Sequence, residues 1–113
     1  YLALLTLTAA SGCSERPAAP QAMDRIVSAD GAALYTAQCA ACHGADGLGL
    51  RGQFPPLAGS DWVNEDRRRL VNVILHGLSG PILVNDEPWD GQMPSFSHLD
   101  DASVAAIAAY TQK

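Results

Sequence analysis

A Cys-x-x-Cys-His run at residues 39–43 is the feature that most constrains what this chain can fold into. The thiols of Cys39 and Cys42 stand three residues apart, and His43 directly follows the second thiol. On one turn of helix, two such sulfurs can reach the two vinyl groups along one edge of a haem, and the histidine is then directed at the iron as the proximal ligand. The run therefore predicts one covalently attached haem c.

Two other kinds of site use a Cys-x-x-Cys pair, namely redox disulfides and zinc sites. A zinc site would need a second pair of ligands, and the only other cysteine in the chain is Cys13, near its start. A thioredoxin-like motif would need a βαβ setting, for which the sequence gives no pattern. Haem attachment is therefore the favoured interpretation.

The first segment, residues 1–13, differs in composition from everything after it. It opens with an apolar, uncharged run, and small residues then lead to Cys13. This order is typical of the apolar region and processing site of an export signal, with Cys13 as the lipidated residue of a bacterial lipobox. The alternative is an uncleaved anchor helix, which would need further residues before Tyr1, because a span takes about 20. Both interpretations tether the chain on the periplasmic side of a bacterial membrane.

Two further segments follow this export or anchor segment. Residues 14–27 are rich in proline and alanine, have little to bury, and are predicted to form a flexible linker. The folded domain is then residues 28–113, which is small enough to need a staple such as a covalently bound cofactor. A net charge of −5 argues against a nucleic acid partner.

The domain is expected to be all-α, built from three to four short helices. Apolar spacing and caps predict helices over about residues 29–40, 64–76 and 101–111. The segments between them are rich in glycine and proline, and no alternating run predicts a sheet. Residues 82–84 are too short a run for more than an extended loop or a minor hairpin arm.

Individual residues set where these helices begin and where they cross. Asn64 and Asp100 are the expected N-caps of the second and last helices. Gly31 costs about 1 kcal/mol in a helix relative to alanine, so a close crossing by another helix would explain it. We expect Gly31 and Tyr35 to meet Tyr110 at that crossing.

Taken together, these features resemble the class I c-type cytochromes, the single-haem electron carriers. The landmarks are the run at residues 39–44, Pro55-Pro56-Leu57-Ala58-Gly59-Ser60, Leu75-His76-Gly77, Gly80-Pro81-Ile82 and Gly91-Gln92-Met93-Pro94. The resemblance covers about residues 30–112, and its latter half is similar to cytochrome domains found with bacterial terminal oxidases, nitrite reductases and membrane dehydrogenases. It implies the cytochrome c fold wrapped around one haem c.

The resemblance also implies the second axial ligand, Met93. A thioether sulfur suits haem iron, and Met/His ligation with His43 raises the reduction potential. Met23 lies in the predicted linker. On chemistry alone His76 and His98 are rival ligands, but structural or exposed roles are the ordinary ones for such residues.

The remaining site residues are expected to support the haem rather than to ligate it. In the family, a proline carbonyl about a dozen residues after the histidine accepts its second ring proton, and Pro55, beside Pro56, fits that spacing. The other expected contacts are Arg51, Trp62 and Trp89 as donors to the propionates, with ordinary packing as the alternative for each tryptophan, and Leu57, Ile74 and Phe96 at the haem faces.

The function that follows is electron transfer in an extracytoplasmic respiratory chain, without catalysis of its own and without a small-molecule substrate. The partners would be redox proteins or a membrane respiratory complex, in which the chain is a shuttle or a fixed subunit of an oxidase, reductase or dehydrogenase. One alternative is a haem enzyme or sensor with a labile Met93, peroxidase-like or gas-binding. Another is a mainly structural role for the haem within a larger complex.

Overall fold

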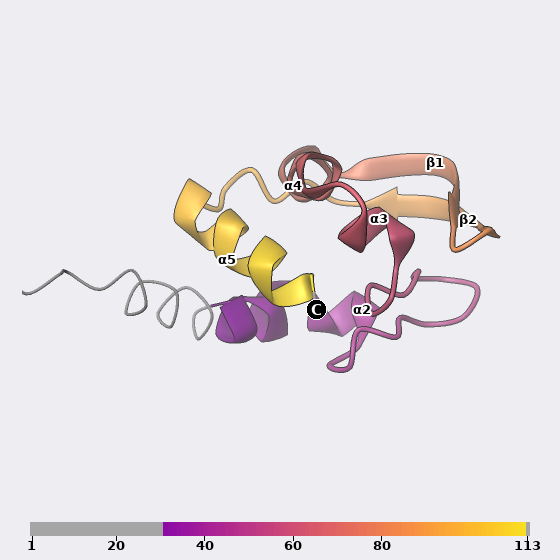
Figure 1. The fold of residues 1–113 in the computed structure, drawn as a ribbon, viewed down its shortest axis with the longest axis horizontal. Coiled ribbons are helices and arrows are strands. Elements are labelled where there is room, and N and C mark those ends of the chain that lie inside the picture. The colour runs from indigo at the N-terminus through magenta and orange to yellow at the C-terminus, as the bar shows by residue number, and fades with distance from the viewer. Residues whose placement is uncertain (1–30, 113) are drawn as a thin grey trace, which may run out of the picture.

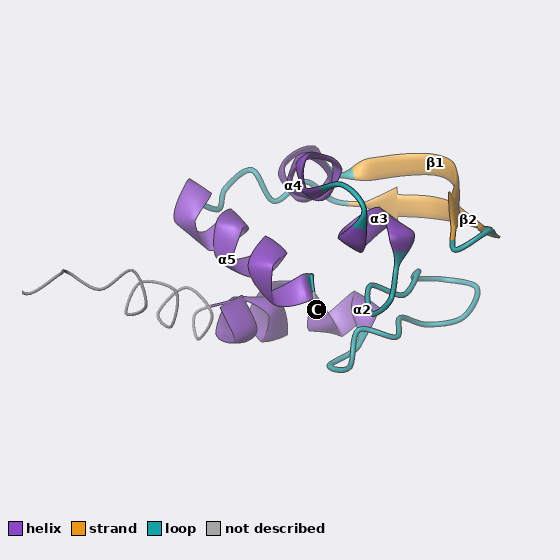
Figure 2. Ribbon diagram, in the orientation of Figure 1, coloured by secondary structure: helices purple, strands orange, loops and turns teal. Residues whose placement is uncertain are grey.

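The structure, a computed structural model, describes residues 31–112 (Figure 1). The expectations for the export or anchor segment 1–13, for lipidation of Cys13 and for the linker 14–27 lie outside the described residues. Residues 31–38 are helical, and the elements that follow are α2 (Ala40–His43), α3 (Asp61–Asn64), α4 (Arg67–His76), β1 (Leu78–Val84), β2 (Glu87–Met93) and α5 (Asp101–Thr111). In Figure 2 the hairpin of β1 and β2 extends from α4 on the side away from α5.

The first and last helices cross closely, as the sequence predicts. A Cβ placed on Gly31 would collide with the carbonyl oxygen of Ala106 and would lie 3.0 Å from the Cβ of Tyr110. The rings of Tyr35 and Tyr110 are 5.3 Å apart and tilted by 47°, within the range of favourable aromatic pairs. The absent side chain of Gly31 is therefore what lets α5 approach the helix of residues 31–38.

The second expected helix is wrong at its beginning, because the segment forms two helices, α3 and α4. The side chain of Asn64 does not cap; its Nδ2 donates back to the carbonyl of Ser60 at 2.9 Å. The chain becomes helical again after Asp66, whose backbone is extended. The carboxylate of Asp66 accepts from the N–H groups of Arg68 and Arg69 at 2.8 and 3.3 Å. A carboxylate at this position satisfies two of the free donors of the first turn of α4, which fixes the start of α4 there.

The all-α expectation is confirmed only in part, because β1 and β2 form a two-stranded antiparallel sheet beside the helices. Leu78 lies opposite Met93 at one end, and Asn85 and Asp86 form the turn at the other end with φ angles of 49° and 64°. One common kind of two-residue hairpin turn has positive φ at both positions, which Asn and Asp tolerate better than most residues. Prolines and glycines interrupt the alternating pattern of both strands, so the sequence predicted at most a minor hairpin arm at residues 82–84.

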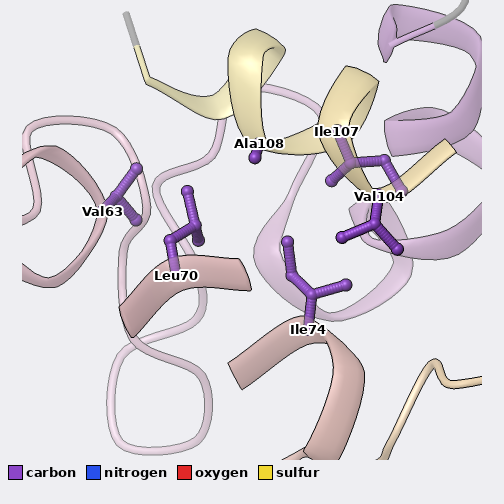
Figure 3. Close-up of a cluster of buried hydrophobic side chains, with 6 residues drawn as sticks. All are labelled: Val63, Leu70, Ile74, Val104, Ile107 and Ala108. Carbon is purple, nitrogen blue, oxygen red and sulfur yellow. The ribbon is translucent and has the colours of Figure 1, made fainter. Parts of the chain in front are cut away.

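The last helix has the predicted bounds and the predicted cap, since the carboxylate of Asp100 accepts from the N–H of Ser103 at 2.8 Å. Helices α4 and α5 bury a small apolar cluster between them, to which α3 contributes one residue (Figure 3). The cluster consists of Val63, Leu70, Ile74, Val104, Ile107 and Ala108. Two of these, Val63 and Leu70, also line the cavity described below, so the core and the cavity share a wall.

Candidate functional site

The two thiols and the histidine lie on one short turn of helix. Cys39 precedes α2, and its carbonyl accepts from the N–H groups of Cys42 and His43 at 3.2 and 3.0 Å. Cys39 is partly buried and Cys42 is exposed, and both are free thiols. Burial, with a smaller contribution from neighbouring Cys42, raises the pKa of Cys39 to about 11. The turn thus presents two unpaired sulfurs and one imidazole from adjacent positions.

The imidazole of His43 is buried, with 8% of its surface exposed, and its orientation is fixed by one hydrogen bond. Its Nδ1 lies 2.9 Å from the carbonyl oxygen of Pro55. Because a carbonyl only accepts, Nδ1 must donate, which leaves Nε2 with a free lone pair. Burial lowers the pKa of His43, and the bond to Pro55 opposes this change in part. The neutral ring, with Nε2 free, is the form that ligates a metal.

A tight loop brings Pro55 back to the histidine. The backbone of Leu50 and Phe54 exchanges two hydrogen bonds of 2.9 and 2.8 Å, and the N–H of Gly49 donates to the carbonyl of His43 at 2.7 Å. A Cβ on Gly49 would collide with the carbonyl oxygen of Phe54 and lie 2.7 Å from that of Pro55. Gly49 has a φ of 72°, so both its backbone angle and its missing side chain are needed for this return.

An apolar cavity opens beside the imidazole, with a volume of about 870 Å³ that includes its mouth. Its walls come from the loop at residues 53–57, from α3 and α4, and from the inward face of the hairpin. Its lining is mainly apolar, as is usual for ligand and cofactor sites. His43 and Met93 both line the cavity, so two residues fifty positions apart in the chain border the same space.

Met93 is half-buried at the end of β2, and the backbone around it is held against α4. A Cβ on Gly77, which follows α4, would collide with the carbonyl oxygen of Met93. Two residues further on, the hydroxyl of Ser95 donates to the carbonyl of Leu75 at 2.6 Å. The position of Met93 is therefore defined by the hairpin on one side and by the end of α4 on the other.

The structure also gives positions for the residues expected to contact the haem without ligating it. Trp62 and Trp89 line the cavity, but the Nε1 of Trp62 donates to the carbonyl of Leu83 at 2.5 Å. The Nε1 of Trp89 is buried and has no hydrogen-bond partner among residues 31–112. Arg51 is exposed outside the lining. A buried donor without a partner on a cavity wall fits a group with an acceptor oxygen, such as a propionate.

The aliphatic and aromatic candidates divide between the cavity and the core. Leu57 lines the cavity. Ile74 is buried between α4 and α5, and Phe96 packs against that cluster, with its N–H donating to the carbonyl of Ile74 at 2.9 Å. His76 and His98 are exposed, and neither lines this cavity.

Sequence reasoning missed the wall that β1 contributes. Leu78, Gly80, Ile82 and Val84 face the cavity, and their burial alternates with exposed residues along the strand. Alternation of this kind is the signal of a half-buried strand, and a search for period two across the proline and glycine could have found it. The cavity therefore has a flat wall where a loop was expected.

The described residues contain neither a cluster of side chains of the zinc-binding type nor a membrane-spanning helix. Within residues 31–112, no group of three or more histidine, cysteine, aspartate or glutamate side chains could hold a metal ion, so a ligand set of the zinc type is not found there. None of the helices described has the length and apolar character that crossing a membrane requires.

A family model matches residues 27–110, and the fold and site agree with what it describes. The chain belongs to the family described as cytochrome c oxidase, cbb3-type, subunit III, and so is a c-type cytochrome. The resemblance seen in the sequence is confirmed by this match.

Curated proteins with similar sequences carry cytochrome names. Cytochrome c-552 of Thermus thermophilus is 43% identical over 86 residues, which cover 73% of this chain and 57% of that protein. The cytochrome c subunit of a quinone alcohol dehydrogenase of Gluconobacter oxydans is 39% identical over 85 residues, 74% of this chain and 18% of that protein. The cbb3-type cytochrome c oxidase subunit FixP of Azorhizobium caulinodans is 33% identical over 89 residues, 77% of this chain and 29% of that protein. The chain spans 57% and 63% of the lengths of two cytochrome c-552 relatives.

Proposed function

We propose that this chain binds one haem c through thioether bonds to Cys39 and Cys42, with His43 and Met93 as the axial ligands. The observation that supports this most is that His43 and Met93 both line one apolar cavity. The Pro55 carbonyl supports it further, because it holds the ring with Nε2 free. When bound, the haem supplies an iron centre that exchanges single electrons.

Electron transfer without catalysis is the function that this ligand set favours. With His43 and Met93 both bound, no coordination position is left open for a substrate, so the chain itself would carry electrons rather than transform a molecule. The mainly apolar walls would limit the access of water to the ligands, and the contacts of the backbone around Met93 with the end of α4 would restrict its movement. No observation favours the alternative of a labile Met93 with peroxidase-like or gas-binding chemistry.

The partners we infer are redox proteins of a membrane respiratory or dehydrogenase complex. This rests on the printed names of the relatives, among them subunits of a cbb3-type oxidase and of a quinone alcohol dehydrogenase. Contacts between such carriers and their partners are small and short-lived when the carrier is a shuttle, and larger when it is a fixed subunit.

Among the expected propionate donors, we propose Trp89 first. Its Nε1 is buried on the cavity wall without a partner within the described part of the chain, whereas the Nε1 of Trp62 already donates to Leu83. Arg51 could act only from outside the cavity lining, as a donor at its mouth. Leu57 would contact the haem directly, and Ile74 and Phe96 would support the wall behind it.

We also propose that the domain of residues 28–113 acts outside the cytoplasm, on the periplasmic side of a bacterial membrane. Residues 1–13 would supply a lipid on Cys13 or an anchor helix, and residues 14–27 would form the linker. The mass of the intact protein tests this, because it gives one haem and either a lipid on Cys13 or a retained leader. A mass without either modification would contradict the tether.

Substitution of the sulfur ligand tests the haem site itself. Met93→Ala should leave the haem attached but lower the midpoint potential, because the thioether ligand that raises it is lost. Redox titration and the optical spectrum of the oxidised protein measure both effects. Ser79→Ala, a change at an exposed residue of β1 that does not line the cavity, is the matched control and should keep the original potential. An unchanged potential and spectrum in Met93→Ala would remove Met93 from the ligand set.

A further inference from the structure

The turn of the hairpin is fastened to the start of α3 by a reciprocal pair of hydrogen bonds. The N–H of Asp61 donates to Oδ1 of Asn85 at 3.0 Å, and the N–H of Asn85 donates to Oδ1 of Asp61 at 3.0 Å. The amide Nδ2 of Asn85 also donates to the carbonyl of Gly59 at 3.3 Å. These bonds, which we name the Asp61–Asn85 clasp, join residues that are 24 or 26 positions apart in the chain.

Neighbouring bonds reinforce the clasp. The Nε1 of Trp62 donates to the carbonyl of Leu83, so the end of β1 is held to α3 at a second point. The same Oδ1 of Asp61 accepts from the N–H of Trp62 at 2.9 Å, which fixes the carboxylate relative to its own helix. Each such bond contributes about 1 kcal/mol, so the set together resists separation of the hairpin from α3.

The clasp matters for the site because α3 and the hairpin are two walls of the same cavity. Trp62 and Val63 line it from α3, and Ile82, Trp89 and Met93 line it from the hairpin. The strands are paired along their whole length, from Leu78 opposite Met93 to Val84 opposite Glu87. A paired hairpin moves as one body, so release of its turn would tilt all of β2 and open the cavity.

Met93 is the last residue of β2, at the end of the hairpin that lies away from the clasp. A Cβ on Gly77 would collide with the carbonyl oxygen of Met93, so the backbone at this end of the hairpin has little room to move and would act as the hinge. A tilt about a hinge moves the backbone there only slightly, yet it turns the direction in which the side chain of Met93 points. Fastening the turn therefore fixes the orientation of the thioether.

We propose that Asp61 and Asn85 are positioning residues that keep Met93 directed into the cavity and keep small ligands out of it. This inference rests on the proposed role of Met93 as an axial ligand. The sequence alone does not predict this role, because an aspartate at the start of a short helix and an asparagine in a turn are each common.

The test is the rate at which imidazole binds to the oxidised holoprotein, followed by its optical spectrum. Asn85→Gly keeps the positive φ of the turn but removes the two bonds that the side chain makes. Binding should become roughly tenfold faster, as expected from the loss of one to two hydrogen bonds in the closed state. Asp61→Ala should act in the same direction, and Asp61→Asn, which retains an acceptor oxygen, should restore a rate close to the original.

Two controls separate the clasp from a general loss of stability. Asp86→Gly changes the other turn residue, which also has positive φ, and leaves the Asn85 side chain in place. Asp66→Ala removes the N-cap of α4 and should lower the stability of the whole protein. Both should keep the original imidazole rate, and a rate in Asp66→Ala as fast as that in Asn85→Gly would overturn the clasp.

Comparison with Met93→Ala distinguishes failure of this inference from failure of the proposed ligand. If the unchanged protein binds imidazole slowly, Met93→Ala binds it fast and Asn85→Gly is as slow as the original, the clasp is wrong and the ligand stands. If the unchanged protein is already as fast as Met93→Ala, the ligand assignment fails and the clasp inference fails with it.

Discussion

Two cysteines only three residues apart lie in different surroundings. Cys39 is partly buried, and its pKa is raised to about 11, first by that burial and then by Cys42. Cys42 is exposed at the mouth of the cavity, whose wall it helps to form. Because the thiolate is the reactive form of cysteine, burial of Cys39 keeps it a thiol at neutral pH before attachment.

Loss of either sulfur should leave the haem with a single thioether bond. Cys39→Ala is the sharper change, because its partly buried side chain also packs against the core cluster. Mass spectrometry of the exported protein, with an optical spectrum of the denatured haem, should show one thioether in this variant. Cys13→Ala is the matched control and should retain two. A Cys39→Ala protein that still carried both bonds would contradict the attachment site.

Asp100 gives the last helix a dependence on pH. Hydrogen bonds from Ser103 lower the pKa of this carboxylate below its usual value of 3.8. A lowered pKa means that the charged form stabilises the fold above pH 3.8 and that this contribution is lost as the pH falls through the lowered pKa. Asp100→Ala should therefore lower the Tm at pH 7, and its difference from the original protein should shrink below pH 3.8.

Thermal unfolding at pH 7 and at several values below 3.8 measures this difference. Asp101→Ala is the control from the same turn, because it leaves the bond between Asp100 and Ser103 in place. A difference in Tm that stayed constant over this range would mean that the charge on Asp100 does not stabilise α5.

Among the elements, the crossing of the first and last helices depends on one missing side chain. Gly31→Ala should destabilise the protein, although alanine is the better helix former by about 1 kcal/mol. The added Cβ would collide with the carbonyl of Ala106, which belongs to backbone and cannot turn aside, and such overpacking costs about 1–3 kcal/mol. Denaturant unfolding of the holoprotein measures the net change.

Ala33→Gly is the matched control for this crossing, because Ala33 is exposed on the same helix. This variant should lower the free energy of unfolding by about 1 kcal/mol, which is the difference in helix propensity between alanine and glycine. If Gly31→Ala proved more stable than the original protein, the helices would have to lie further apart than the structure places them.

The sequence predicted those elements whose signals are local. The cap at Asp100 and the apolar spacing after it define α5, and the run at residues 39–43 needs only one turn of helix to bring its side chains together. The start of α4 could not be predicted as reliably, because Asn64 and Asp66 are both good caps. The choice between them depends on Asn64 donating to Ser60, a contact that only the folded chain supplies.

The part of the cavity that depends on residues close together in the chain was also predictable. The bond between His43 and Pro55 spans twelve residues of a loop, so a fixed spacing could suggest it. The hairpin wall depends on pairing between strands, on Asn85 and Asp86 accepting positive φ, and on bonds to α3. None of these leaves a strong apolar pattern, so the sequence suggested a loop where there is a strand.

At the scale of the whole molecule, residues 31–112 have little core apart from the walls of the cavity. Six buried residues form the cluster between α3, α4 and α5, and the loops and hairpin otherwise border the apolar cavity. A domain of this size gains too little from burial to fold firmly alone, so a bound cofactor should supply much of the stability.

The chain without haem should therefore lose its fixed tertiary structure. The Cys39→Ala/Cys42→Ala double variant, produced without haem attachment, should keep part of its helical signal in far-UV circular dichroism but lose the near-UV signal of Trp62 and Trp89, because both rings lie on the cavity wall. Its amide protons in α5 should also exchange much faster than those of the holoprotein, since the cluster that buries α5 shares Val63 and Leu70 with the cavity. A single cooperative unfolding transition, with near-UV intensity equal to that of the haem-bearing protein, would contradict this prediction. It would mean that packing between α4 and α5 is enough to stabilise the fold without haem.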